Sequence, residues 1–229
     1  RTVVVLVAYM DPDSVAALRG TDDAHIGADG RVPRGSSDDP SLLDFSANTN
    51  PTVPPGTHDV FADAFDAARS YPDDSFPEFR VAAAEFVGCD PAAVVPTAGG
   101  LEALRLATAT GLRPGDTALV PCPSFGEYAR EIRLQGGEPV FTPHDELLDA
   151  DPAEHAMAVV CNPNNPTGDA ADATRLREFA ERCRASDTLL LVDEAFLGFT
   201  DEPSLAGRDG VVVARSLTKL FGLPGLRMG

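Results

Sequence analysis

The sequence predicts an α/β fold in which a mostly parallel sheet carries helices on both faces. Short apolar runs alternate with longer amphipathic segments from about Leu42 to the end of the 229-residue chain. The run at 188–193 is mostly apolar and closes on an acid, as in a strand buried on both sides. An apolar content of 43% can fill a core. We therefore expect an N-terminal arm at residues 1–41 and one large domain at residues 42–229.

The expected elements follow one another along the chain. Residues 11–40 are polar and rich in Gly, Asp and Pro, so only a short helix near 14–19 is expected there. An apolar run at 94–97 precedes Gly99 and Gly100, which open a helical pattern that extends to Leu112. The remaining predictions are strands at 117–121, 139–142, 156–161, 188–193 and 210–214, and helices at 125–135 and 172–185.

The composition excludes several classes of partner. A formal charge of −18 and a pI near 4.4 argue against binding to nucleic acid or to an anionic membrane, and resemble adaptation to high salt. The apolar run at 2–9 is too short to cross a bilayer. Neither the cysteines nor the four histidines have metal-ligand spacing, so no metal is expected. We expect a cytoplasmic protein with four buried, reduced thiols: Cys89, Cys122, Cys161 and Cys183.

Lys219 is the only lysine among 18 Lys and Arg residues. An amine can lose its proton and attack a carbonyl carbon, whereas a guanidinium cannot. The alternative is a surface lysine retained by chance. Its neighbours, Ser216-Leu217-Thr218 before it and Pro224-Gly225-Leu226-Arg227 after it, favour a site for pyridoxal phosphate (PLP).

Two further residues have the chemistry that such a cofactor needs. Asp193 ends a buried strand, where a carboxylate is costly unless it meets a cation such as a protonated pyridine nitrogen. A helix cap or a loop salt bridge is the alternative. Asn165 lies in a loop fixed by prolines and a glycine, Asn162-Pro-Asn-Asn-Pro-Thr-Gly168, and its amide can donate to an oxygen anion. Its alternative is a plain turn.

An anion site is also indicated. Gly99 and Gly100 at a helix start expose backbone N–H groups to a phosphate. Ser216, Thr218 and Arg227 add hydroxyls and a guanidinium. Phe125 follows a strand and could stack on the ring of the cofactor, although an ordinary core aromatic explains it nearly as well.

Four motifs, Asn-Asn-Pro-Thr-Gly, Asp-Glu-Ala-Phe, Ser-Leu-Thr-Lys and Pro-Gly-Leu-Arg-Met-Gly, occur in this order. Their combination resembles the class I and II aminotransferases of fold type I, and most closely their histidinol-phosphate aminotransferase and threonine-phosphate decarboxylase branch. The resemblance implies that Lys219 forms a Schiff base with PLP, that Asp193 pairs with the pyridine nitrogen and that Asn165 bonds the phenolic oxygen. It implies a homodimer, in which Tyr71 reaches the phosphate of the neighbouring subunit. The other implied cofactor contacts are Phe125 on the ring and Gly100, Leu101, Ser216, Thr218 and Arg227 around the phosphate.

The resemblance favours the decarboxylase over the aminotransferase by a modest margin. Phe125 and Phe196 stand where the aminotransferases commonly have tyrosines, and the stretch at 44–51 resembles the decarboxylase signature. Asn48 and, less securely, His25 match residues that contact a small phosphorylated, amino-acid-like substrate, and Asn165 is expected to contact that substrate as well. Leu101 departs from the hydroxyl residue usual at its position, which leaves only its backbone for the phosphate. The first choice is therefore L-threonine-O-3-phosphate decarboxylase of cobalamin biosynthesis, and the alternative is histidinol-phosphate aminotransferase of histidine biosynthesis.

The resemblance begins near Leu43 and reaches Gly229. It implies that the chain lacks the C-terminal small domain and the strand that follows Lys219 in the family. An unpaired sheet edge with exposed apolar surface is then expected, and an inactive fragment is a further alternative. A nicotinamide-dependent oxidoreductase is disfavoured, because no strand is followed by G-x-G-x-x-G. A regulator would need a basic helix-turn-helix, which this acidic chain does not offer.

Overall fold

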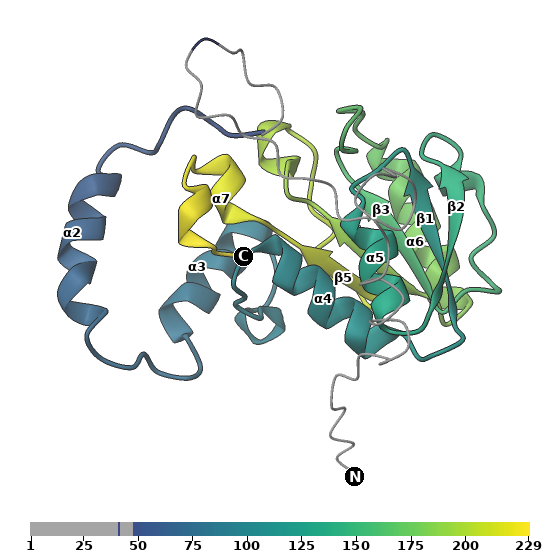
Figure 1. Cartoon of the computed structure of the whole chain (residues 1–229), viewed down its shortest axis with the longest axis horizontal. Coiled ribbons are helices and arrows are strands. Elements are labelled where there is room, and N and C mark those ends of the chain that lie inside the picture. Colours follow the sequence, from purple (N-terminus) through teal and green to yellow (C-terminus); the bar gives the residue numbers. More distant parts are fainter. Residues whose placement is uncertain (1–40, 42–47) are drawn as a thin grey trace.

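A computed structural model describes residue 41 and residues 48–229, so the expected helix at 14–19 and His25 lie outside the described residues. Five strands form one sheet in the order β2-β1-β3-β4-β5, and every neighbouring pair is parallel (Figure 1). The predicted parallel α/β fold is confirmed. The strands are β1 (Thr117–Cys122), β2 (Glu138–Pro143), β3 (Met157–Cys161), β4 (Leu189–Asp193) and β5 (Val211–Ala214).

Helices cover both faces of the sheet, as the nearly continuous apolar strands predict. The helices α4 (Gly100–Gly111) and α5 (Glu127–Leu134) share a core with one face of the strands. The helix α6 (Ala173–Ala185) packs on the other face through Phe179, which is fully buried. The carboxylate of Asp172 caps α6 by accepting the N–H groups of Thr174 and Arg175. The core therefore consists of two layers separated by the sheet.

The strand register aligns the ends of three strands. Cys161 on β3 lies opposite Asp193 on β4, and Asp193 lies opposite Ala214 on β5. Side chains alternate between the faces of a strand. Because Leu191 faces the α4/α5 core, Asp193, two residues later, faces the same side. The sheet thus delivers a carboxylate to its carboxyl edge, beneath α5.

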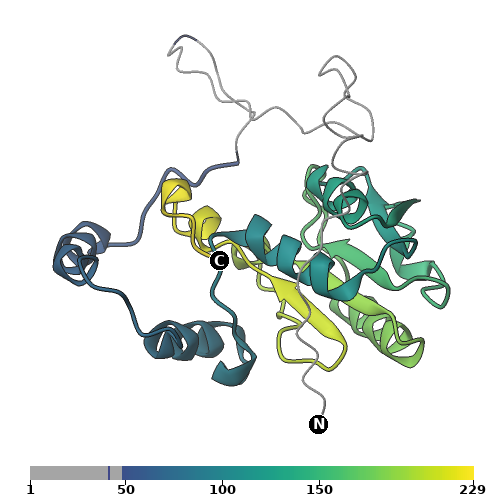
Figure 2. The same ribbon diagram turned by 60° about the horizontal axis from the view of Figure 1, so that its bottom comes forward.

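Three helices were not predicted from the sequence: α2 (Thr57–Ala67), α3 (Pro77–Val87) and the short α7 (Leu217–Leu220). None of the residues of α2 is buried, and Ala84 is the only buried residue of α3. The helices α2 and α3 lie to one side of the sheet, near α7 and away from β2 (Figures 1 and 2).

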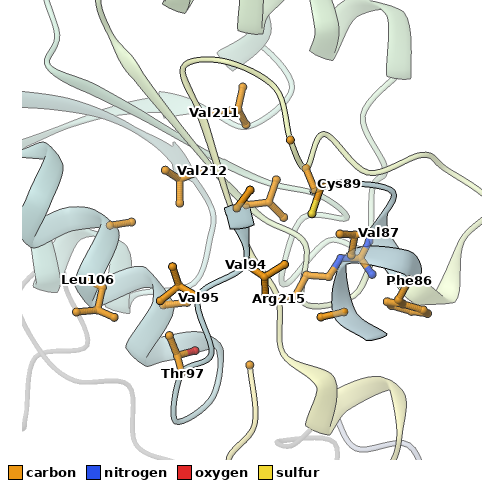
Figure 3. Close-up of a pocket in the computed structure, with 18 of the residues that line it drawn as sticks. Phe86, Val87, Cys89, Val94, Val95, Thr97, Leu106, Val211, Val212 and Arg215 are labelled. Carbon is orange, nitrogen blue, oxygen red and sulfur yellow. The ribbon is translucent and has the colours of Figure 1, made fainter. Parts of the chain in front are cut away.

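An apolar cavity of about 600 Å³ lies beside β5, between the sheet, α4, α3 and the segment before α4 (Figure 3). In the described part of the chain β5 has a strand partner on one side only, β4. The expected apolar surface at a sheet edge is found here, with Val95, Leu106 and Val212 exposed. Residues 94–97 are extended but form no strand; Thr97 instead exchanges both backbone hydrogen bonds with Gly229.

The expectation of four buried thiols is wrong in part. Cys161 and Cys183 are buried, but Cys89 is half-buried and Cys122 is exposed, because β1 ends at the surface with that residue. All four thiols are free. Within residues 48–229, no helix is both long enough and apolar enough to cross a membrane.

Candidate functional site

Lys219 lies on α7, which follows β5 directly. Its Nζ donates to the carbonyl oxygen of Asn48 at 3.3 Å and stands 5.8 Å from the centre of the Phe196 ring. Phe196 follows β4 by three residues, so the end of the neighbouring strand supplies the aromatic contact. The amine is thereby held at the carboxyl edge of the sheet, where parallel sheets bind ligands.

Asp193 is buried, with 8% of its surface exposed. Its Oδ2 accepts the Tyr128 hydroxyl at 2.7 Å and its Oδ1 accepts the Ala195 N–H at 3.0 Å. Burial raises the pKa of the Asp193 carboxyl above its ordinary value, while these two hydrogen bonds and the positive charge of Lys219 oppose the rise. Phe196, three residues after Asp193, contacts the Lys219 amine, and Ala214 on the strand that leads to Lys219 pairs with Asp193, so the predicted amine and the predicted acid lie in one region.

The loop that carries Asn165 connects β3 to α6. The N–H of Asn165 points at the Cys161 sulfur at 3.4 Å. Asn162 secures the far side of the loop by accepting the Ala171 N–H, and Asn164 donates to the carbonyl of Pro123 at 3.1 Å. These contacts join the loop to the ends of β1 and β3, and the side chain of Asn165 stays half-exposed at the edge of the sheet.

The residues predicted to hold a phosphate converge at the start of α4. Gly99 has φ of 92°, in the region that favours glycine, and a Cβ there would lie 3.0 Å from the Arg227 guanidinium. A Cβ on Gly100 would lie 3.2 Å from the Cβ of Ser216. The hydroxyls of Ser216 and Thr218 are 3.0 Å apart. Two glycines, two hydroxyls and a guanidinium therefore form a cradle that side chains at the glycine positions would fill.

Leu101 and Phe125 both pack against the α4/α5 core. The Leu101 side chain is thus occupied in the core, which leaves its backbone N–H in the first helical turn, where such groups have no partner within the helix. Phe125 meets Tyr128 edge-on, with ring centres 5.6 Å apart. Tyr71 is fully exposed between α2 and α3. Asn48 reaches Lys219 with its backbone oxygen.

A short extended segment lies over the residues that follow Lys219. The Asn50 side chain donates to the carbonyl of Leu220 at 2.7 Å. Gly222 has φ of 66°, and a Cβ on it would lie 2.6 Å from the carbonyl oxygen of Thr52. Glycine at 222 therefore allows the segment 50–52 to touch the loop backbone directly, which holds Asn48 above the amine.

These residues fit the group that the resemblance implies. PLP needs an amine, a carboxylate for its pyridine nitrogen and donors for its phosphate. The buried Asp193 and the glycine cradle at Gly99 and Gly100 supply the last two, and Lys219 supplies the first. The sequence predictions missed Tyr128 and Cys161, which contact Asp193 or its partners. One signal could have found Tyr128: in the helix predicted at 125–135, Tyr128 stands three residues after Phe125 and so lies on the same side of that helix.

Comparisons with known proteins agree with this geometry. The "Aminotransferase class I and II" family matches residues 40–229. Histidinol-phosphate aminotransferase of Leuconostoc mesenteroides is 36% identical over 174 residues, which are 69% of this chain and 48% of that protein. Threonine-phosphate decarboxylase of Salmonella typhimurium is 32% identical over 203 residues, or 82% of this chain and 55% of that protein.

The fold is also found among solved structures. The L-threonine-O-3-phosphate decarboxylase of Porphyromonas gingivalis superposes with a TM-score of 0.71 at 26% identity, over 80% of this chain and 60% of that one. The chain spans about half the length of the curated relatives named above. With the family match over residues 40–229, the resemblance predicted from the sequence motifs is confirmed: the chain belongs to the class I and II aminotransferase family.

Proposed function

We propose that this chain is the cofactor-binding part of a PLP-dependent enzyme that acts on a small phosphorylated amino acid. One observation carries the proposal: the only lysine and the buried Asp193 lie at the carboxyl edge of one parallel sheet, where Phe196, three residues after Asp193, contacts the lysine amine. Bound PLP would accept the electron pair of a bond broken at the substrate α-carbon.

Each predicted residue then has a task of its own. Asp193 would hold a proton on the pyridine nitrogen, and Asn165 would donate to the phenolic oxygen. The N–H groups at the start of α4 would bind the phosphate together with the side chains of Ser216, Thr218 and Arg227. Phe125 would cover one face of the ring. Lys219 would attach the cofactor and, once released from it, could carry a proton to or from the α-carbon.

L-threonine-O-3-phosphate decarboxylase is our first choice of activity. Phe196 supports it, because the residue that contacts the Lys219 amine has no hydroxyl, whereas the aminotransferases commonly have a tyrosine there. The Asn48 backbone beside the amine is the second support, since Asn48 matches a substrate-contacting position of the decarboxylase. His25, the other predicted substrate contact, remains a prediction. Histidinol-phosphate aminotransferase stays the alternative because the Leuconostoc relative is 36% identical.

The cofactor site is tested first. The full-length protein mixed with PLP should absorb in the visible, and borohydride should fix PLP to Lys219, as peptide mass spectrometry would show. Lys219→Ala should abolish the fixation. Fixation of PLP to another residue in the wild-type protein would refute the assignment.

The activity is tested on the full-length protein by two assays. Carbon dioxide released from O-phosphothreonine would support the decarboxylase. The second assay mixes histidinol phosphate with 2-oxoglutarate and measures glutamate, which forms if the protein transfers the amino group as expected of the aminotransferase branch. That result without carbon dioxide release would replace our first choice by the alternative.

We further propose a homodimer. Tyr71 projects fully exposed from the connection between α2 and α3, and the two helices bury almost nothing in their own chain. A second copy would cover the exposed α2 side chains and receive Tyr71. Analytical ultracentrifugation of the full-length protein should show twice the mass of one chain; a single-chain mass at micromolar concentration would contradict this.

A further inference from the structure

A line of buried polar contacts connects Asp193 to Asn165, two residues that come from different strand ends. The Tyr128 hydroxyl donates to Asp193 Oδ2 at 2.7 Å. The Cys161 thiol donates to the Pro163 carbonyl at 3.3 Å and lies beside that hydroxyl, and the Asn165 N–H points at the Cys161 sulfur at 3.4 Å. Tyr128 is on α5 and Cys161 ends β3, so helix and sheet both contribute to the line.

The contacts of Asp193 restrict how its carboxylate can turn. The Ala195 N–H holds Oδ1 and Tyr128 holds Oδ2, so rotation of the carboxylate would break both bonds. Tyr128 is itself fixed, because it is buried and its ring meets Phe125 edge-on. A buried tyrosine needs a partner for its hydroxyl, but any backbone carbonyl would satisfy that need. Here the partner is the one carboxylate that the site requires.

We propose that Tyr128, supported by Cys161, is a positioning residue that orients the Asp193 carboxylate toward the pyridine nitrogen of PLP. The inference rests on the proposed function, because it takes the cofactor to be the partner of Asp193. Tyr128 would touch neither cofactor nor substrate and acts only through Asp193.

The proposed role of Tyr128 can be measured through the pKa of Asp193. The groups that face it are Tyr128 on α5, Cys161 on β3, Lys219 on α7 and its neighbour Glu194. Burial raises the pKa of the Tyr128 phenol well above its ordinary value and that of the Cys161 thiol to about 12, so both stay uncharged near neutral pH. The hydrogen bond from Tyr128 lowers the pKa of Asp193.

Removal of that hydroxyl should therefore raise the Asp193 pKa. PLP affinity that needs the ionised carboxylate is present above this pKa and is lost as the pH falls through it. In Tyr128→Phe the loss should begin at a higher pH than in the wild-type protein. The titrations of PLP itself are the same for both proteins and cancel in the comparison.

The test measures the Kd of PLP against pH for the full-length protein and Tyr128→Phe. In Tyr128→Phe we expect the Kd to rise about tenfold at neutral pH. We also expect the acid limb of the profile, the pH range in which binding is lost on acidification, to move to higher pH. The matched control is Thr188→Val, which removes another buried hydroxyl, one that donates to Pro152 at 2.9 Å next to the opposite end of β4. A merely structural role would weaken binding without moving the limb. An unmoved limb in Tyr128→Phe, or an equal shift in Thr188→Val, would overturn the proposal.

Cys161 is tested by a second matched pair. Cys161→Ala should raise the Kd of PLP more than Cys183→Ala does, because both thiols are buried but Cys183 is on α6, which packs on the other face of the sheet. Equal effects of the two substitutions would remove Cys161 from the proposal.

A measurement without PLP separates this inference from the proposed function. Urea unfolding of the wild type, Tyr128→Phe, Asp193→Asn and the double variant forms a double-mutant cycle. Coupling between the two sites is expected, and additive effects would contradict the link. If the wild-type protein failed to bind PLP while the coupling persisted, the proposed function would fail and the contact between Tyr128 and Asp193 would stand.

Discussion

The sheet with α4, α5 and α6 differs from the pair α2 and α3 in where the apolar side chains go. In the sheet they are buried within the chain, and Phe179 on α6 has no exposed surface. On α2 the large apolar side chains Phe61 and Phe65 are 61% and 68% exposed. The first region is held by its own core, whereas the second presents a surface. Stability and assembly should therefore respond to substitutions in different regions.

The largest contrast should come from aromatic truncation. Phe179→Ala should lower the free energy of unfolding by about 4 kcal/mol, because it leaves a cavity in a packed core. Phe65→Ala in the dissociated chain should change it by less than about 0.5 kcal/mol, since the ring is mostly in water. Urea unfolding at low protein concentration measures both. Comparable losses would mean that α2 has a core of its own.

The next largest loss of stability should come from removing the buried charge of Glu194. Its Oε2 lies 3.0 Å from Arg215 and also accepts the Ser204 hydroxyl, inside the sheet region. Glu194→Gln should cost about 3 kcal/mol, because a largely buried guanidinium then loses its counter-charge. The exposed pair of Arg175 and Asp149 is the control: Asp149→Asn should cost less than about 0.5 kcal/mol. Thermal and urea unfolding would show whether burial sets the difference.

Helix capping should give a smaller effect. Asp172 caps α6 with two hydrogen bonds, whereas Gly56 before α2 offers no side-chain cap. Asp172→Ala should therefore lower the free energy of unfolding by about 1 kcal/mol. Asp172→Asn keeps an acceptor and should recover most of this loss. A failure of Asn to recover it would point to the charge of Asp172 instead of the cap.

The smallest effect on folding should accompany the largest effect on assembly. Phe61→Glu with Phe65→Glu should change the free energy of unfolding of the isolated chain by less than about 1 kcal/mol, because both sites are exposed. If a second copy covers α2, the same pair of substitutions should abolish the dimer in analytical ultracentrifugation. An intact dimer would place the interface elsewhere.

The contrast between the regions also explains what the sequence could predict. All five predicted strands, at 117–121, 139–142, 156–161, 188–193 and 210–214, agree with the structure to within a residue at either end. In β3 and β4 nearly complete burial explains the continuous apolar run that marks the strand in the sequence. The helices α2 and α3 were not predicted, although Phe61 and Phe65 of α2 are four residues apart, as on one face of a helix. In the structure that face is exposed instead of packing on the sheet. Val95 and its neighbours are apolar but pair with no strand in the described chain.

The site could be predicted in part for a similar reason. Lys219, Asp193 and the Gly99–Gly100 pair are chemically unusual where they stand in the sequence. Tyr128 has a helical spacing from Phe125, but nothing in the sequence connects it to Asp193, which is 65 residues away and is brought to it only by the packing of α5 on the sheet. Where a side chain matters through its neighbour, the fold must be known first.

The close contact at Gly222 has a consequence for how this site could evolve. Any side chain there would displace the Thr52 carbonyl and, with it, the strand-like segment that sets Asn48 above the amine. A single methyl group at residue 222, which does not itself take part in the chemistry, could thus displace the backbone beside the Lys219 amine. Selection on this one glycine would then act on the geometry of the site without any change in the groups that do the chemistry.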